Sequence, residues 1–412
     1  MPTITFERVQ HFIERKYEQY LLRPAYRLSM PSKIRKMRSK DKITVLFLIS
    51  ELGAWKTEEL YCKMREHPRF HPILGITVSP ENYNEFQPLL EYVKKKGYEY
   101  YNTQDYLNVH IWEYKPDIVF YQKPYDEAIH YSFNYRRHLN SLFCNVNYAP
   151  HMLIEKWAIN QPLYNYLWQY YFENESVAEE HRKIKKNKKC ITVTGVPCFD
   201  CLIKDKSEYP TPWKNQNKEK KKIIWAPHHT IPEMNTSGIA YSTFVDYCDY
   251  MLELAKKYKE TTQWAFKPHP ILKNKLYFIW GKDKTDCYYN EWASLENSQL
   301  ETGEYIGLFK HSDAIIHDCS AFTVECHFTH NPILYLVRDN DEHIKNLTTY
   351  GRKAFDLHYK GYNKEDIEKF IVHVLNGEDK IKGERERFYN EYLLPPNGKT
   401  ACENIIDAIL YK

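Results

Sequence analysis

The second half of the chain contains three short, largely apolar runs, at residues 223–226, 263–266 and 314–316, and polar residues follow each of them closely. Runs of this length are typical of buried strands in a parallel sheet. The polar residues that follow them are His228 and His229, Lys267 and His269, and Asp318 and Ser320. Because the carboxyl ends of parallel strands face one crevice, we expect these side chains to converge there.

The residue types at these strand ends suit a diphosphate. A lysine and two or three histidines can donate hydrogen bonds to phosphate oxygens. Helical periodicity resumes after Ser320, and the N–H groups at the start of a helix also favour an anion, with the hydroxyls of Ser320 and Thr323 as further donors. Asp318 is expected either to cap this helix or to hold a ribose. No Asp-x-Asp pair accompanies these strands, so we predict no metal and no cofactor.

Composition restricts the class of protein. A chain of 412 residues that is 43% hydrophobic suits two ordinary domains, and a net charge of +4 gives no indication of a nucleic-acid partner. The amino terminus lacks the continuous apolar stretch of a signal peptide, and the ten cysteines include a single C-x-x-C, at Cys198 and Cys201. We therefore expect free thiols and a cytoplasmic location.

Residues 1–42 form a separate basic segment. Apolar residues including Phe12, Ile13 and Tyr17 recur at helical spacing, and a cluster of lysines and arginines follows between residues 33 and 42. An amphipathic helix with adjacent basic charge could lie on the inner face of an anionic membrane as a peripheral contact. The alternative is a helix packed on the body of the protein, followed by a solvated basic loop. The sequence supports both interpretations.

The remainder reads as two α/β domains. Strand and helix patterns alternate from residue 43 onwards, which favours parallel sheets of the Rossmann type, although the first turn lacks G-x-G-x-x-G. We assign 43–201 to a first Rossmann-like domain and 223–360 to a second. A polar, lysine-rich linker is expected at 202–222 and further helices at 361–412. His151 follows the strand expected at 142–148 and would face the cleft from the first domain.

An ordered set of short motifs resembles the CDP-glycerol glycerophosphotransferases. The motifs are His151, Gly195-Val196-Pro197 with Asp200, Ala226-Pro227, His269-Pro270, Ser312-Asp313 through Asp318 and Ser320, and Asn331-Pro332-Ile333-Leu334. Members of that family make teichoic-acid and capsule polymers on a GT-B scaffold, in which two Rossmann-like domains face each other across a cleft. The sequence departs from the family pattern at Met152, Cys198, His228-His229-Thr230, Cys319 and Ala321.

The resemblance implies a transferase with two catalytic histidines, in which the first domain (43–201) binds the acceptor and the second (223–360) binds the nucleotide donor. His151 would deprotonate an acceptor hydroxyl, His269 and Ser320 would lie near the donor diphosphate, and Asp318 would lie in the nucleotide-binding turn. The donor would be CDP-glycerol or a related CDP-alditol. The acceptor would be a cell-surface polysaccharide or its lipid-linked precursor. Two other interpretations remain open: a GT-B glycosyltransferase or nucleotide-sugar epimerase, and a non-catalytic membrane-associated scaffold.

Overall fold

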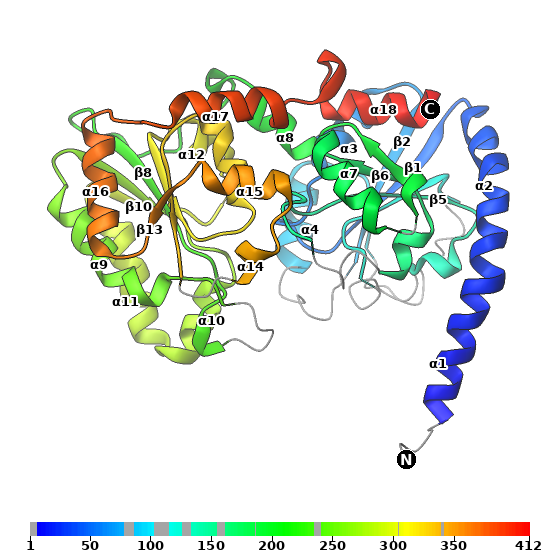
Figure 1. Cartoon of the computed structure of the whole chain (residues 1–412), viewed down its shortest axis with the longest axis horizontal. Coiled ribbons are helices and arrows are strands. Elements are labelled where there is room, and N and C mark those ends of the chain that lie inside the picture. The colour runs from blue at the N-terminus through cyan, green and yellow to red at the C-terminus, as the bar shows by residue number, and fades with distance from the viewer. Residues whose placement is uncertain are drawn as a thin grey trace. The chain divides into compact units, whose positions relative to one another are not determined.

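The computed structural model describes residues 6–77, 86–102, 115–125, 133–154, 161–185, 187–234, 240–303, 305–338 and 342–412 (Figure 1). Its contacts divide the chain into two compact units. Unit 1 comprises Met1–Ala149, Glu155–Asp200 and Pro395–Lys412, and unit 2 comprises Pro150–Ile154 and Cys201–Leu394. Each unit contains one parallel sheet with helices, so the expected α/β class is confirmed.

Unit 1 is built on a sheet of seven parallel strands in the order β3-β2-β1-β4-β5-β6-β7. The strands are β1 (Ile43–Ile49), β2 (Phe70–Ile76), β3 (Tyr100–Asn102), β4 (Ile118–Tyr121), β5 (Leu142–Val146), β6 (Leu167–Phe172) and β7 (Ile191–Val193). The order reverses between β1 and β4, as in a Rossmann sheet. The helices are α1 (Phe6–Tyr17), α2 (Arg23–Arg38), α3 (Glu58–Glu66), α4 (Phe86–Lys95), α7 (Glu175–Ile184), α18 (Ala401–Tyr411) and α8 (Pro197–Ile203), whose last three residues belong to unit 2.

Unit 2 repeats this topology with six parallel strands in the order β10-β9-β8-β11-β12-β13. The strands are β8 (Lys221–Ala226), β9 (Thr262–Phe266), β10 (Ser298–Leu300), β11 (Ala314–His317), β12 (Ile333–Leu336) and β13 (Tyr359–Gly361). The helices are α9 (Phe244–Lys257), α10 (Leu272–Ile279), α11 (Lys282–Ser294), α12 (Ile306–Lys310), α13 (Phe322–Glu325), α14 (Glu342–Lys345), α15 (Thr349–Asp356), α16 (Lys364–Leu375) and α17 (Lys382–Phe388).

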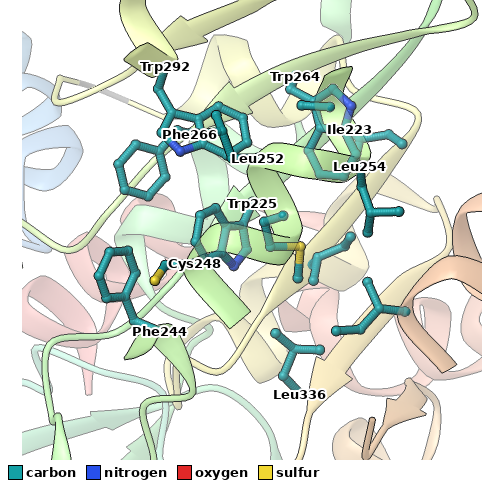
Figure 2. Close-up of a cluster of buried hydrophobic side chains, with 14 of the residues drawn as sticks. Ile223, Trp225, Phe244, Cys248, Leu252, Leu254, Trp264, Phe266, Trp292 and Leu336 are labelled. Atoms are coloured by element: carbon teal, nitrogen blue, oxygen red, sulfur yellow. The ribbon is translucent and has the colours of Figure 1, made fainter. Parts of the chain in front are cut away.

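An aromatic core fixes the strands that carry the polar residues of unit 2 (Figure 2). The Trp225 ring of β8 stacks on Phe244 of α9 and on Phe266 of β9, with ring centroids 5.6 and 5.0 Å apart. Trp292 of α11 stacks on Phe266 at 5.3 Å. Buried aromatic rings dominate the stability of such a core. They therefore hold the ends of β8 and β9 in a defined position.

The segment expected to be an interdomain linker is packed on unit 2. Trp213 is buried, and its indole N–H donates to the Leu308 carbonyl at 3.2 Å. The ammonium of Lys214 donates to the carbonyls of Ala293 and Ser298 at 2.9 and 2.8 Å. The lysine-rich composition of 202–222 concealed these contacts, because one buried tryptophan is enough to dock a polar segment.

The last helices do not form one separate block after residue 360. Residues 395–412 belong to unit 1, where the buried Asp200 carboxylate accepts the N–H groups of Ala401 and Cys402 at 2.8 and 2.9 Å. A carboxylate at this position stabilises the amino-terminal end of α18. The long-range partner of Asp200 therefore explains why the chain returns to unit 1.

The amino-terminal segment divides into an attached part and an exposed part. α1, the π-helical turn η1 (Glu18–Leu22) and α2 follow one another directly (Figure 1). On α2, the buried Tyr26 ring stacks on Phe143 at 5.3 Å, so this helix packs on unit 1. Phe12, Ile13 and Tyr17 of α1 and Tyr20 and Leu21 of η1 are exposed, although the Glu18 carboxylate of η1 accepts hydrogen bonds from Tyr135 and Arg136 of unit 1. The expected basic loop is helical as far as Arg38.

Within the described ranges, no helix combines the length and the apolar character needed to cross a bilayer.

Candidate functional site at the switch point of unit 2

The strand order of unit 2 brings three polar strand ends side by side. β8 pairs with β9 through Trp225 and Phe266, and with β11 through Ala226 and His317. The order of the sheet reverses between β8 and β11, and ligands of open α/β sheets bind beyond such a reversal. The residues after these strands therefore lie where a nucleotide site is expected in this fold.

Three histidines form a compact cluster there. The ring centroids of His228 and His229 lie 4.3 Å apart, those of His229 and His269 4.3 Å, and those of His228 and His269 4.8 Å. His228 is buried, and the other two side chains are half-buried. Residues separated by about 40 positions in the sequence thus share one small volume because β8 and β9 are neighbours.

Backbone hydrogen bonds fix the tautomers of two of these rings. Nδ1 of His269 accepts the N–H of Ile271 at 3.2 Å, and Nδ1 of His228 accepts the N–H of Thr230 at 3.3 Å. A neutral imidazole whose Nδ1 accepts a hydrogen bond carries its proton on Nε2. His228 and His269 are therefore arranged to present Nε2–H donors without needing a positive charge.

Burial keeps His229 and His269 of this cluster neutral. It lowers the pKa of His229 to about 4 and that of His269 to about 3, with a further contribution from nearby Lys275 in both cases. At neutral pH these rings offer hydrogen bonds but no net charge. A positive charge must come from neighbouring lysines.

Lys267 supplies one such charge. Its ammonium donates to the Gly303 carbonyl at 2.9 Å and lies 5.9 Å from the centroid of the Tyr305 ring. Burial lowers the pKa of Lys267 to about 8, although Glu301 acts in the opposite direction. Lys267 is thus still mainly protonated at neutral pH, but its charge is sensitive to mildly alkaline conditions.

The same histidines have the composition of a metal site. One ring nitrogen from each of His228, His229 and His269 lies within 4.8 Å of the other two. However, a metal on Nε2 of His269 would require a proton on Nδ1, where the Ile271 N–H already points. The hydrogen bonding of His228 and His269 therefore fits anion donors better than metal ligands.

Asp318 has a different role from the predicted ribose contact. Its carboxylate is fully buried and accepts the N–H of His228 at 2.6 Å, the N–H of Thr243 at 2.6 Å and the Thr243 hydroxyl at 2.9 Å. Burial raises the pKa of Asp318 to about 6, against the effect of these donors. Asp318 therefore positions the loop after β8 and the start of α9, and it is shielded from a ligand.

The two hydroxyls expected at the start of a helix, those of Ser320 and Thr323, differ in burial and in hydrogen bonding. Thr323 is fully buried, and its hydroxyl donates back to the Cys319 carbonyl at 3.4 Å, so it is not available to a ligand. Ser320 is half-buried and accepts the Tyr241 hydroxyl at 3.4 Å. The helix itself, α13, has only four residues before a 3-10 turn at Cys326–Thr329. The expected helix-dipole contribution is correspondingly small.

Tyr241 was not predicted from the sequence. Its ring stacks on His228 with centroids 4.7 Å apart, while its hydroxyl reaches Ser320. It therefore joins the strand ends of β8 and β11 at the site. The lone tyrosine before α9 carries no recognisable motif, so the packing of the fold was needed to find it.

His151 belongs by its contacts to unit 2 rather than to the first domain. Its carbonyl accepts the Thr348 hydroxyl at 3.1 Å, and Leu153 forms an antiparallel bridge with Leu347. A side chain on Gly351 would collide with the Met152 carbonyl, so glycine allows this close approach. The His151 side chain is only 3% exposed. The expectation that it projects from the first domain therefore does not describe this segment.

A second group of histidines lies wholly inside unit 2. His317, His327 and His358 are buried, with ring centroids 5.2 Å apart for His317 and His358 and 4.9 Å for His327 and His358. Nε2 of His327 and Nδ1 of His358 both donate to the Ala354 carbonyl, at 2.9 and 2.8 Å. Lys360 and Arg385 are the nearby cations that disfavour protonation, together with His330. These rings serve packing rather than ligand binding.

The buried histidines His317, His327 and His358 predict that the folded protein loses stability in acid. Burial lowers the pKa of His317 and His327 to about 3, so the stability that their neutral forms provide is present above about pH 6.5 and is lost as the pH falls toward 3. Between pH 7 and pH 5 we expect a loss of about 2 kcal/mol for each ring. Between these two pH values, the free energy of unfolding measured in urea should fall about 2 kcal/mol less for His327→Gln than for the wild type. For His373→Gln the fall should equal that of the wild type. An equal loss in all three proteins would contradict the assignment.

The chain matches no protein-family profile and no curated protein sequence. Among solved structures it is similar to a Listeria monocytogenes protein described as a UDP-N-acetylglucosamine 2-epimerase, at 16% identity and a TM-score of 0.59, over 90% of this chain and 96% of that one. It is similar to the Neisseria meningitidis UDP-GlcNAc 2-epimerase bound to UDP-GlcNAc, at 16% identity and a TM-score of 0.54, over 90% and 100%.

A third similar structure is the wall teichoic acid polymerase TagF, in a histidine variant soaked with CDPG. The identity is 13% and the TM-score 0.54, over 99% of this chain and 98% of the other. At these identities the comparison establishes a shared fold. The two Rossmann-type sheets and these neighbours place the chain in the GT-B-like class of α/β proteins.

Proposed function

We propose that the protein transfers glycerol phosphate, or a related alditol phosphate, from a CDP-activated donor to an acceptor hydroxyl. The observation that carries this proposal is the pair of Nε2–H donors on His228 and His269 at the switch point of the second sheet, with Lys267 near enough to His269 to lower its pKa. Fixed donors of this kind stabilise charge on a diphosphate without reorganising. The motif order in the sequence favours a CDP-alditol donor, and the structurally similar TagF was soaked with CDPG.

The proposed reaction is an in-line displacement at the donor's β-phosphorus. The acceptor oxygen forms the new P–O bond, the bond between the β-phosphorus and the bridging oxygen breaks, and CMP leaves with the bridging electron pair. The acceptor proton passes to a base, for which His151 is the candidate from the family resemblance. His269 and Lys267 would offset the charge that develops on the leaving CMP, which is the main catalytic task in phosphoryl transfer.

Nucleotide-sugar epimerisation is the second candidate function. It is favoured by the neighbours that are UDP-GlcNAc 2-epimerases and by the same strand-end position for a diphosphate. The two functions differ in their products, because transfer releases CMP whereas epimerisation leaves the nucleotide attached. Incubation of the purified protein with CDP-glycerol, CDP-ribitol and UDP-GlcNAc separates them. Binding of all three donors without turnover would instead support a non-catalytic scaffold.

Donor binding should weaken in alkali. The pKa of Lys267 is lowered to about 8, whereas those of His229 and His269 are about 4 and 3, so only the lysine loses charge between pH 7 and pH 9. We expect the dissociation constant for CDP-glycerol, measured by calorimetry, to be constant from pH 6 to 7 and to rise above pH 8. Lys267→Arg should remove the rise because guanidinium stays charged. The same rise in this variant would exclude Lys267 as its cause.

We further propose that α1 and η1 place the enzyme at an anionic membrane surface. Phe12, Ile13 and Leu21 expose apolar side chains, and Arg15 and Lys16 lie in the last turn of α1. Deletion of residues 1–22 should weaken sedimentation with vesicles containing phosphatidylglycerol, and salt should weaken wild-type binding. α2 is kept in this deletion because it packs on unit 1. Undiminished binding of the shortened protein would show that these helices do not contact lipid.

A further inference from the structure

The switch point of unit 1 carries its own group of polar and aromatic residues. The sheet order reverses between β1 and β4, and β5 lies next to β4. Beyond the ends of these three strands lie Ser50 and Glu51, Gln122 and Lys123, and Tyr125 and Tyr148. The topology therefore gives unit 1 a second position at which this fold binds ligands, independent of the histidine cluster in unit 2.

Hydrogen bonds hold the polar part of this group in place. Oε1 of Gln122 accepts the Ser50 N–H at 2.6 Å and the Ser50 hydroxyl at 3.1 Å. The Gln122 amide donates to the Glu51 carbonyl at 2.7 Å. One side chain thus ties the end of β1 to the end of β4. The cluster is preorganised before any ligand arrives, which reduces the entropic cost of binding.

A shielded ion pair lies at the same place. Nζ of Lys123 is 2.6 Å from Oε1 of Glu51, and the two side chains are only 15% and 17% exposed. The pair has no net charge, so it attracts a phosphate weakly. It does present an ammonium donor and a carboxylate acceptor together. Sugar hydroxyls, which both donate and accept hydrogen bonds, match such a pair.

Two tyrosines complete the group. The rings of Tyr125 and Tyr148 are 6.4 Å apart between centroids and inclined at 71°, and their hydroxyl oxygens are 3.2 Å apart. Lys123 lies 6.0 Å from the centroid of the Tyr148 ring. Both tyrosines are half-buried. An aromatic surface beside paired polar groups suits the apolar face and the hydroxyl edge of a sugar ring.

We infer that this cluster, formed by Glu51, Gln122, Lys123, Tyr125 and Tyr148, binds an uncharged sugar residue of the acceptor. The inference rests on the proposed function, since it names the chemical class of the acceptor in that reaction. It goes further in one respect: the recognised part of the acceptor is a saccharide and not a phosphorylated alditol. The ion pair of Lys123 and Glu51 favours a saccharide over a phosphorylated alditol, because the negatively charged phosphate of the alditol would face the Glu51 carboxylate.

Two variants with opposite expected effects test the inference. Binding of maltose, cellobiose, N-acetylglucosamine and glycerol phosphate to the full chain is measured by saturation-transfer NMR and calorimetry. We expect at least one saccharide to bind the wild type and Tyr148→Ala to weaken that binding about tenfold, equivalent to about 1.4 kcal/mol. Glu51→Gln keeps the side-chain volume but leaves Lys123 unpaired, so glycerol phosphate should bind this variant more tightly than the wild type.

The controls separate this inference from the proposed function. Tyr411→Ala removes a tyrosine that is 76% exposed on α18 of the same unit, and it should leave saccharide binding unchanged. Failure of every saccharide to bind, or equal binding by Tyr148→Ala and the wild type, would overturn the inference even if CMP is released from CDP-glycerol. Tyr148-dependent saccharide binding without CMP release would overturn the proposed reaction and leave the sugar site supported.

Discussion

His269→Ala is expected to slow release of CMP from CDP-glycerol about 10²–10³-fold, the usual cost of removing one preorganised donor to a developing negative charge. The Nδ1 of His269 accepts the Ile271 N–H, so the ring is fixed with its donor at Nε2. His269→Gln can place an amide N–H near the Nε2 position, and we expect it to recover part of the lost rate. Steady-state kinetics with saturating donor measures both effects.

The glutamine variant makes this prediction specific to a hydrogen-bond donor. If His269 acted as a base, glutamine would be as inactive as alanine, because an amide cannot take a proton at neutral pH. His373→Ala, on α16 of the same unit, provides a matched control and should retain full activity. Wild-type rates in His269→Ala on all CDP donors would refute the assignment of His269 to the diphosphate.

His151→Asn is expected to reduce transfer about 10²–10⁴-fold, the contribution of a positioned general base, while donor affinity stays unchanged. Rate and donor affinity should respond differently because the base acts on the acceptor hydroxyl, whereas the groups proposed to bind the donor follow β8, β9 and β11. The backbone at His151 is attached to Thr348, at the start of α15. Calorimetry with CDP-glycerol and CMP release with acceptor present report the two quantities separately.

The alternative outcomes for His151 are informative in different ways. Equal losses of donor affinity and rate would place His151 at the nucleotide. Unchanged transfer would show that it is a structural residue of the 150–154 segment, consistent with its burial. His71→Asn, at an exposed position of unit 1 beside Glu99, controls for the general effect of losing a histidine.

The sequence predicts the parts of the site that depend on local pattern. The apolar runs before His228, Lys267 and Asp318 each form a strand, and the parallel-sheet rule places their ends together. By contrast, the strands β3, β10 and β13 have three residues each, which is too short for a repeating pattern of apolar residues to be recognised. Their positions follow from pairing with longer neighbours, which the sequence alone does not specify.

The parts that the sequence does not predict depend on distant partners. The buried role of Asp318 requires the N–H groups of His228 and Thr243, which are 90 and 75 residues away. The short length of α13 reflects a change to 3-10 geometry at Cys326 that apolar spacing does not reveal. His151 is assigned to unit 2 because the chain beside it bonds to Thr348, almost 200 residues later. Such contacts are tertiary and leave no local signal.

The identity of the phosphorus-containing products tests the central claim most directly. Purified protein is incubated with CDP-glycerol and a saccharide acceptor, and phosphorus NMR follows the diphosphate signals. We predict that these signals disappear while the phosphomonoester of CMP and a new phosphodiester appear in equal amounts. Persistence of intact CDP-glycerol, together with conversion of UDP-GlcNAc to its epimer by the same preparation, would contradict the account.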